Sequence, residues 1–376
     1  MASHPLLDLK QHGQSVWLDN LSRPLIRSGE LQRLVREDGI TGVTSNPAIF
    51  NKAMTSGTAY DEAMTKLVQA GKTTLEIYEA LAITDIQDAC DVLRPVHDAT
   101  GGSDGFVSLE VSPHLADDTQ GTIEEAARLW NTVGRRNLLV KIPGTAAGVP
   151  AVEACLTRGI NVNVTLLFSL AAHADVIDAH IRALKTRAGK GEDLRQIASV
   201  ASFFLSRIDV KLDPMLASMA RDGEHATKAR DLMGKVAVAN AKLAYGLWQG
   251  KMESADWRAL AAAGARVQKP LWASTSTKNP DYSDVMYVEP LIGPNTVNTM
   301  PDETIVAFKN HGQAGLTVTS GVEEARATLA SLADLGIDMD RVTDELLAEG
   351  ITKFVKPFDD LLAALEAKRE SLATAG

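Results

Sequence analysis

The sequence alternates short β-type runs with longer stretches of helical periodicity, and this alternation restricts the fold more than any other feature. A polar or glycine-containing turn follows each run. The runs are Ser15–Asp19, Gly42–Asn46, Gly105–Val111, Asn137–Ile142, Asn161–Phe168, Ile197–Phe204, Pro270–Thr275 and Thr296–Met300. Eight such runs with helices between them favour a closed parallel barrel over an open sheet. The predicted fold is therefore α/β, a (β/α)₈ TIM barrel.

The length of the chain fits one such barrel. It has 376 residues, and barrels of this kind run from roughly 250 to more than 400 residues as one unit. We therefore expect a single domain over residues 1–376. Residues 207–266 and 321–371 hold more helix than a strand-helix repeat needs, and we expect them to be helical elaborations packed on the barrel. The second region is a helical tail, for which self-association is the alternative role.

Local signals predict several helix ends. Pro95 is expected to end the helix that begins near residue 74, because proline disrupts a helix interior. Thr122 and Glu125 have the spacing of a capping box, and Ser169 is placed to cap the helix that follows it.

Charge and cysteine content limit the partners and the compartment. The formal charge of -10 argues against broad binding to nucleic acid or to an anionic membrane, so a phosphorylated substrate requires a local basic pocket. Cys90 and Cys155 are the only cysteines and lack metal-site spacing, which is typical of a reducing compartment. The start of the chain lacks a signal-peptide pattern, and no apolar run has membrane-spanning length. We expect a cytoplasmic monomer or homodimer whose partners are small molecules.

One lysine is placed as a nucleophile. Lys141 follows Leu138, Leu139 and Val140 near the end of the fourth run, and the turn Pro143–Gly144 comes directly after. Its stem would leave an apolar core and its amine would reach the mouth of the barrel. Burial there disfavours the ammonium form, which makes a lysine usable for Schiff-base chemistry. The alternative is a strand-end lysine that merely reaches solvent.

Other polar residues fall where the same model requires them. Active sites of TIM barrels are built at the carboxyl ends of the strands. The residues at those positions are Asp19, Asn46, Glu110, Asn163 and Thr165. Asn163 and Thr165 lie two apart, so strand alternation directs both to one face.

Each of these residues also has a structural interpretation. Asp19 can cap the segment after the first run, and Asn46 before Pro47 is typical of a turn. Glu110 lies between Leu109 and Val111, where a carboxylate requires a partner, and a structural ion pair would provide one. Asn163 and Thr165 can satisfy buried backbone groups. Their shared placement around one lysine favours the functional interpretation.

Four segments together resemble a known family. They are Thr-Ser-Asn-Pro, Ser-Leu-Glu-Val, Val-Lys-Ile-Pro-Gly-Thr and Gly-Ile-Asn-Val-Asn-Val-Thr-Leu-Leu-Phe-Ser. In this order and at these separations they are similar to the transaldolases of the pentose phosphate pathway. The resemblance extends from about Asp19 to the eighth run, and the helical ending is similar to the longer bacterial form of that family.

The resemblance implies a role for each matching residue. Lys141 would form the Schiff base with a ketose donor, and Asp19 would be the acid/base of carbon-carbon cleavage. Glu110 and Thr165 would hold and activate a water molecule. The residues implied to contact the dihydroxyacetone part of the donor are Asn46, Asn163 and Ser202. A cationic iminium serves as the electron sink in this chemistry, so neither a metal nor a cofactor is expected.

The phosphate contacts are the least defined part of the resemblance. Arg207 follows the sixth run and is placed to clamp a dianion. The shorter members of the family supply a second anchor, a serine and an arginine, after the seventh strand. Here the segment reads Ala-Ser-Thr-Ser-Thr-Lys-Asn-Pro, so Ser274 and Lys278 are the expected contacts, with Ser276 as an alternative. Ordinary packing for Ser202 and a surface position for Arg207 are the corresponding structural interpretations.

Three functions remain open on this basis. The first is a transferase that moves a dihydroxyacetone unit from sedoheptulose 7-phosphate to glyceraldehyde 3-phosphate, giving erythrose 4-phosphate and fructose 6-phosphate. The second is a Schiff-base aldolase of the same architecture that releases dihydroxyacetone to water. The third is a sugar-phosphate-binding barrel without turnover. The first is the leading hypothesis, and the full set of polar residues argues against the third.

Overall fold

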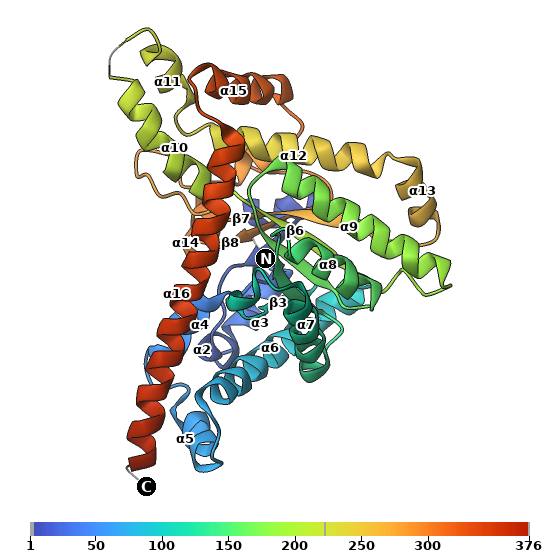
Figure 1. Cartoon of the computed structure of the whole chain (residues 1–376), viewed down its shortest axis with the longest axis vertical. Helices are drawn as coiled ribbons and strands as arrows, with labels where there is room; N and C mark the ends of the chain where they lie inside the picture. Colours follow the sequence, from blue (N-terminus) through green and yellow to red (C-terminus); the bar gives the residue numbers. More distant parts are fainter. Residues whose placement is uncertain (1–3, 222, 375–376) are drawn as a thin grey trace.

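The computed structural model describes residues 4–221 and 223–374, in which eight parallel strands close into a barrel (Figure 1). The strands follow one another around the barrel in chain order. They are β1 Gln14–Leu18, β2 Gly42–Val43, β3 Phe106–Glu110, β4 Leu138–Pro143, β5 Val162–Leu167, β6 Ser199–Phe204, β7 Gln268–Ala273 and β8 Thr296–Met300. β8 pairs with β1 from Gln14↔Thr296 to Leu18↔Met300, which closes the ring. The predicted (β/α)₈ barrel is confirmed.

The first two strands are shorter than predicted at their carboxyl ends. β1 ends at Leu18, and the backbone N–H of Asp19 donates to the Met300 carbonyl at 2.8 Å. β2 ends at Val43, because Asn46 caps the helix that starts at Pro47 and its Oδ1 accepts from the Ile49 N–H at 3.0 Å. Both polar residues therefore lie just beyond the sheet, where side chains from different strands converge.

Helices surround the barrel and extend from it. Up to β5 they are α1 Pro5–Asp8, η1 Leu9–His12, α2 Arg23–Arg27, α3 Glu30–Glu37, α4 Pro47–Thr55, α5 Asp61–Gln69, α6 Thr74–Ala99, η2 Pro113–Leu115, α7 Thr119–Val133 and α8 Gly148–Thr157. The remaining ones are α9 Leu170–Gly189, α10 Ser206–Met219, α11 Ala226–Leu232, α12 Val236–Met252, α13 Ala255–Ala262, η3 Glu289–Leu291, α14 Asp302–His311, α15 Val322–Asp334 and α16 Met339–Thr374. The two helical elaborations correspond to α10–α13 and to α15–α16.

Two of the predicted helix ends were wrong. α6 continues past Pro95 to Ala99. Proline removes one helical hydrogen bond, to the carbonyl four residues earlier, and Asp91 is exposed, so water can solvate that carbonyl. Thr122 lies inside α7, which begins earlier because Asp118 caps it by accepting from Gly121 N–H at 2.9 Å. Ser169 caps α9 as predicted, accepting from Ala172 N–H at 3.0 Å.

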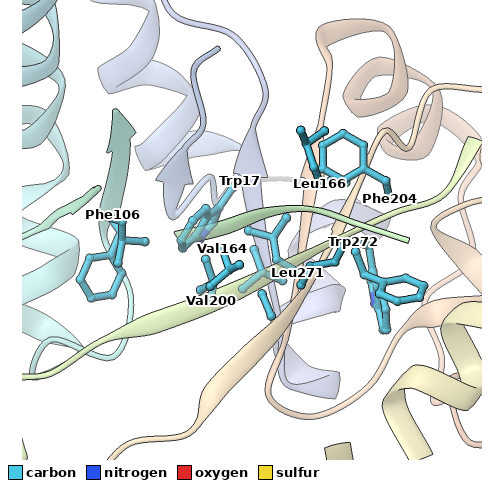
Figure 2. Packing of buried hydrophobic residues seen from close by; sticks show 14 of the residues in the cluster. Trp17, Phe106, Val164, Leu166, Val200, Phe204, Leu271 and Trp272 are labelled. Carbon is cyan, nitrogen blue, oxygen red and sulfur yellow. The ribbon is translucent and has the colours of Figure 1, made fainter. Parts of the chain in front are cut away.

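The core combines barrel strands with the helices outside them. Figure 2 shows Trp17, Phe106, Val164, Leu166, Val200, Phe204, Leu271 and Trp272, all buried. Trp17 and Trp272 are each fixed by a hydrogen bond, from Trp17 Nε1 to Asp104 Oδ1 and from Trp272 Nε1 to the Leu291 carbonyl, both at 2.9 Å. A Cβ at Gly42 would lie 2.5 Å from the Trp17 ring, so the barrel requires glycine beside this indole.

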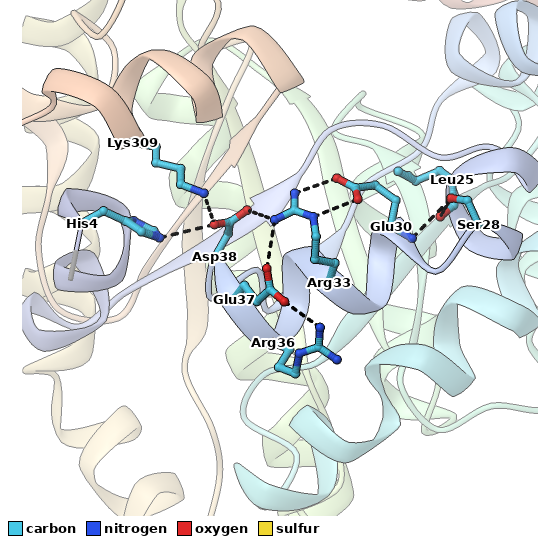
Figure 3. A network of polar contacts seen from close by, with 9 residues as sticks. All are labelled: His4, Leu25, Ser28, Glu30, Arg33, Arg36, Glu37, Asp38 and Lys309. Atoms are coloured by element: carbon cyan, nitrogen blue, oxygen red, sulfur yellow. Dashed lines mark hydrogen bonds and ion pairs between the residues drawn. The ribbon is translucent and has the colours of Figure 1, made fainter. Parts of the chain in front are cut away.

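A charged network reinforces the β1–β8 seam from outside (Figure 3). Asp38, which follows α3, is 2% exposed and accepts from Lys309 of α14 and, at 3.1 Å, from Arg33 of α3. His4 lies 3.3 Å from the same carboxylate. Burial raises the pKa of Asp38, but the contacts with Lys309 and Arg33 outweigh it and hold this pKa below its usual value. The network joins α3 to α14.

Candidate functional site

A small cavity of about 90 Å³ opens where the carboxyl ends of the strands meet. Its walls come from the ends of seven strands, all but β3, and from the start of α10 and from α16. The lining residues are Asp19, Thr44, Asn46, Lys141, Thr165, Ser202, Phe204, Arg207, Ala273, Ser274, Thr299 and Phe354. Except for Glu110, Asn163 and Lys278, every residue predicted for the site is among them.

Lys141 is at the centre of a polar row across three strands. In the sheet register it pairs with Glu110 of β3 on one side and with Asn163 of β5 on the other. The residue is 5% exposed. Its Nζ donates to the Ser45 carbonyl at 3.1 Å and lies 3.6 Å from Glu110 Oε2. The amine thus points into the barrel mouth, as predicted, and has a carboxyl partner in place.

The Glu110 carboxyl is nearly excluded from water. Its side chain is 7% exposed, and Oε2 has no hydrogen-bond partner among the described residues. Burial raises the pKa of Glu110 to about 7, although the Lys141 ammonium beside it acts in the opposite direction. A carboxyl with this pKa can donate or accept a proton near neutrality. Glu110 also lines a second, larger cavity of about 330 Å³, which Asn46 shares.

Asp19 lines the same cavity as the Lys141 amine. Its Oδ1 accepts from Thr44 Oγ1 at 2.7 Å, and that hydroxyl also lies 2.7 Å from Thr299 Oγ1. Burial raises the pKa of Asp19, while Lys141, the Thr44 hydrogen bond and Arg207 act against the increase. The site therefore contains two separate carboxyl groups, both with a raised pKa.

Buried amide and hydroxyl groups join β3, β5 and β6. Ser202 Oγ donates to Asn163 Oδ1 at 2.7 Å, and Asn163 Nδ2 donates to Ser108 Oγ at 3.0 Å. Asn163 therefore lies behind Ser202 rather than on the cavity wall. Thr165 does line the cavity, and its buried Oγ1 has no partner among the described residues. This hydroxyl is free for a ligand or a water molecule.

Arg207 is a half-buried cation that no described carboxylate contacts. Its guanidinium lies 5.1 Å from the centre of the Phe204 ring and 5.8 Å from that of Phe354. Nη1 is buried and unbonded, and no carboxylate of residues 4–221 or 223–374 forms an ion pair with this side chain. Burial lowers the pKa of Arg207, whereas Asp19, Glu110 and Glu349 raise it. Such a group is a strong anion-binding element.

Of the predicted phosphate contacts after β7, one lines the cavity and one does not. Ser274 lines it in a left-handed backbone conformation, with φ of 57°, and its Oγ lies 2.8 Å from Ser206 Oγ. Lys278 is not on the wall, and its Nζ donates to Ser276 Oγ at 2.8 Å.

Sequence reasoning missed several lining residues. Thr44 had a usable signal, because it lies two residues before Asn46 at the same strand end. Thr299 is the last residue but one of β8, the strand for which no polar site residue was predicted. Phe204 and Phe354 gave no signal beyond being apolar, and Phe354 comes from the helical tail.

Residues 4–221 and 223–374 contain no group of three or more His, Cys, Asp or Glu residues placed to hold a metal ion. They also contain no helix long and apolar enough to span a membrane.

Comparison with known proteins gives matches over nearly the whole chain. The family model described as transaldolase/fructose-6-phosphate aldolase matches residues 16–365. "Transaldolase 2" of Nostoc sp. is 53% identical over 379 residues, covering 99% of this chain and 100% of the relative. "Transaldolase" of Trichodesmium erythraeum is 48% identical and covers 99% of both chains. "Transaldolase" of Thiobacillus denitrificans is 49% identical over 95% of this chain and 98% of its own length.

Proposed function

Because the chain belongs to the transaldolase/fructose-6-phosphate aldolase family, we propose that it is a transaldolase acting through a lysine Schiff base. It moves a dihydroxyacetone unit from sedoheptulose 7-phosphate to glyceraldehyde 3-phosphate, which gives erythrose 4-phosphate and fructose 6-phosphate. The single observation that carries the proposal is the buried Lys141 amine, 3.6 Å from Glu110 and in one cavity with Asp19 and Arg207.

Lys141 is proposed as the nucleophile. Its amine adds to the ketone carbon of the donor, and loss of water from the carbinolamine gives an iminium. These steps require proton transfer at the nitrogen and at the departing oxygen. Glu110 is the nearest carboxyl to that nitrogen, and its pKa of about 7 suits both directions of transfer.

Asp19 is proposed as the base for carbon-carbon cleavage. This step removes a proton from the C4 hydroxyl and leaves an enamine on Lys141, while the iminium nitrogen accepts the electron pair. The C4 hydroxyl lies several atoms from the nitrogen, so a second carboxyl is required. Asp19 lines the same cavity from β1, and Thr44 fixes its orientation.

Thr165 and Glu110 are proposed to hold the water used in dehydration and in hydrolysis of the Schiff base. The unpartnered Thr165 Oγ1 and Glu110 Oε2 supply the hydrogen-bonding capacity. Asn46 and Ser202 are proposed to bind the dihydroxyacetone part of the donor, and Asn163 is proposed to support this contact through the Ser202 hydroxyl, from which its Oδ1 accepts. Asn46 uses its Oδ1 for the helix cap, so only its Nδ2 is left to donate.

Arg207 is proposed as the main phosphate contact, because its Nη1 is buried and unbonded and its guanidinium lacks a carboxylate partner among the described residues. Ser274 supplies a hydroxyl on the wall of the same cavity. Lys278 is proposed as an outer cation that acts through Ser276, whose hydroxyl it holds.

The Schiff-base aldolase is the second candidate, because the description of the matching family names fructose-6-phosphate aldolase as well. Acceptor dependence separates the two candidates. A transferase consumes fructose 6-phosphate efficiently only when an aldose phosphate acceptor is present, whereas an aldolase releases dihydroxyacetone without one. A binding barrel without turnover would give neither product and no borohydride-trapped adduct. Product analysis with sedoheptulose 7-phosphate and glyceraldehyde 3-phosphate tests the leading proposal directly.

We also propose a cytoplasmic location, a monomeric or homodimeric state and a single domain. The location is supported by the two cysteines, Cys90 and Cys155, which are buried free thiols as in proteins of reducing compartments. The single domain is supported by the packing of the last helix, α16, against α4, α5, α6 and α10.

A further inference from the structure

The C-terminal helix α16 covers the mouth of the barrel. Figure 1 shows it as a long helix (red) that runs from the side of α10 past α4 to the side of α5, and it contacts all three as well as the end of β5. Polar contacts hold it along its length. Lys211 of α10 pairs with Glu345 at 2.9 Å and Glu349 at 2.7 Å, His114 pairs with Asp359 at 2.8 Å, and Lys368 pairs with Asp61. The helix is therefore a fixed part of the site.

A glycine allows α16 to approach the strand ends closely. A Cβ at Gly350 would lie 2.9 Å from Leu166 Cδ2 and 3.5 Å from Arg207 Nη1. Leu166 follows Thr165 in β5 and has a left-handed backbone, with φ of 61°, at a register shift between β5 and β6. Residues four apart share one face of a helix. The close contact at Gly350 therefore directs Phe354 at the site.

The Phe354 ring forms the roof over the nucleophile. The Lys141 Nζ lies 5.4 Å from the centre of this ring, and the Arg207 guanidinium lies 5.8 Å from it, both within cation–π range. Phe354 lines the cavity and is 6% exposed. An apolar ring thus lies between the reacting amine and the solvent outside α16.

The fate of the enamine depends on access of solvent to it. After cleavage, the nucleophilic carbon of the Lys141 enamine can attack the acceptor aldehyde, whose oxygen then takes a proton. The adduct is again an iminium, and addition of water releases the new ketose and restores the Lys141 amine, which completes transfer. Alternatively that carbon takes a proton from solvent, and the enamine becomes an iminium. One water then adds to the iminium carbon, and dihydroxyacetone leaves as the Lys141 amine is restored. The first fate is transaldolase chemistry and the second is aldolase chemistry.

We propose that Phe354 determines this partition: its ring keeps bulk water from the enamine carbon and so makes the protein a transferase. The inference rests on the proposed function and adds a specificity-determining residue from the helical tail. The water proposed between Glu110 and Thr165 serves the nitrogen side of the adduct and is not displaced by the ring.

The test compares two products in one reaction. Wild-type protein and Phe354→Ala receive fructose 6-phosphate with erythrose 4-phosphate, and we measure free dihydroxyacetone and sedoheptulose 7-phosphate. The ratio of free dihydroxyacetone to sedoheptulose 7-phosphate is expected to rise roughly tenfold or more in Phe354→Ala. This corresponds to a change of about 1.4 kcal/mol in the difference between the activation free energies of protonation and transfer. Phe354→Leu keeps apolar volume but loses the ring, and a smaller rise is expected. If Phe354→Ala does not fold, the product ratio of Phe354→Leu tests the proposal instead.

Phe358→Ala is the matched control, since it removes an equally buried ring one turn further along the same helix. Phe358 is 5% exposed, and its ring packs 5.3 Å from Tyr78 rather than over Lys141. Its product ratio should equal that of the wild type. An unchanged ratio in the Phe354 variants, with active transfer in the wild type, overturns this inference alone, and so does an equal rise in Phe358→Ala. Absence of both transfer and a trapped adduct in the wild type overturns the proposed function instead.

Discussion

The Nζ of Lys141 lies 3.6 Å from Oε2 of Glu110, and the two residues are paired across β4 and β3. Their side chains are 6% and 7% exposed, so little water screens the contact. The distance is that of an ion pair and is longer than a hydrogen bond. Oε2 therefore keeps hydrogen-bonding capacity for a water molecule or for a nitrogen that becomes an iminium.

Lys141→Ala should abolish covalent capture of fructose 6-phosphate under borohydride, because no other amine lines the cavity. Mass spectrometry of the intact protein and of its peptides measures the adduct. Lys269→Ala is the control, since Lys269 lies near the amino end of β7 and donates to the Ser103 carbonyl, away from the cavity. Labelling of a different lysine in the wild type would remove Lys141 from its proposed role.

Asp19→Asn should separate Schiff-base formation from cleavage. The variant retains Lys141 and Glu110, so it should still form the adduct, but it lacks the base for the C4 hydroxyl. Turnover should fall by roughly 10²–10⁴-fold, the usual contribution of a positioned general base. Borohydride should trap the intact six-carbon adduct in the variant in place of the three-carbon one. Wild-type turnover would refute the assignment of Asp19.

The pH dependence of turnover should reflect Glu110. Since its pKa is raised to about 7, the carboxylate form, which acts as the base, increases as the pH rises through about 7. Activity should therefore increase over that range and then level off. Glu110→Gln should lower activity and remove this step of the profile. If Glu110→Gln keeps a rise in activity of equal size near pH 7, that rise reflects the titration of another group.

The same shift predicts an effect on stability. The ordinary pKa of a glutamate is 4.5, so between 4.5 and about 7 the folded protein binds more protons at Glu110 than the unfolded chain does. The contribution of Glu110 to the free energy of unfolding should then decrease as the pH rises through this window. Denaturant titrations of the wild type and Glu110→Gln at several pH values measure the difference. If the wild type instead becomes more stable relative to Glu110→Gln as the pH rises through this window, the raised pKa of Glu110 is contradicted.

Arg207→Ala should weaken binding of phosphorylated sugars selectively. Loss of one buried charged contact costs about 2 kcal/mol or more, so KM should rise roughly thirtyfold or more. Donors without phosphate should be affected much less. Steady-state kinetics with fructose 6-phosphate and with fructose measure the two effects, and equal losses would show that Arg207 has a structural role instead.

Gly350→Ala should destabilise the packing of α16. The new methyl group would lie 2.9 Å from Leu166, and overpacking of this kind costs about 1–3 kcal/mol, more than the gain of about 0.5–1 kcal/mol in helix propensity. Gly246 of α12 is the matched control, because a Cβ there meets nothing within 4 Å and Gly246→Ala should be stabilising. Thermal and denaturant unfolding measure both. Equal stabilisation of the two variants would mean that α16 does not press on β5.

The barrel could be predicted from the sequence because its signal is local and repeated. Each strand is an apolar run with a turn after it, and the polar residues at the run ends converge only if the sheet closes. This is why Asp19, Asn46, Lys141 and Thr165 could be expected in one place, where the structure has them. The eventual position of a strand end is set by caps and ladder bonds, so β2 proved shorter than predicted.

The roof of the site could not be predicted in this way. Phe354 looks like any core position of an amphipathic helix, and only the docking of α16 reveals that it faces Lys141. Pro95 failed as a helix end for a related reason: the rule is local, whereas the cost of proline depends on whether the freed carbonyl meets water. The position of Lys278 depends on the path of a loop that strand periodicity does not describe.

The pairing of β1 with β8 has a consequence for synthesis on the ribosome. The strand with Lys141 emerges early, yet the ring cannot close until Thr296–Met300 has left the exit tunnel, and Phe354 follows later still. Contacts this distant in sequence form slowly. A nascent chain therefore carries its nucleophile as an ordinary hydrated lysine, and reactivity arises only after β8 and α16 have been made and have docked.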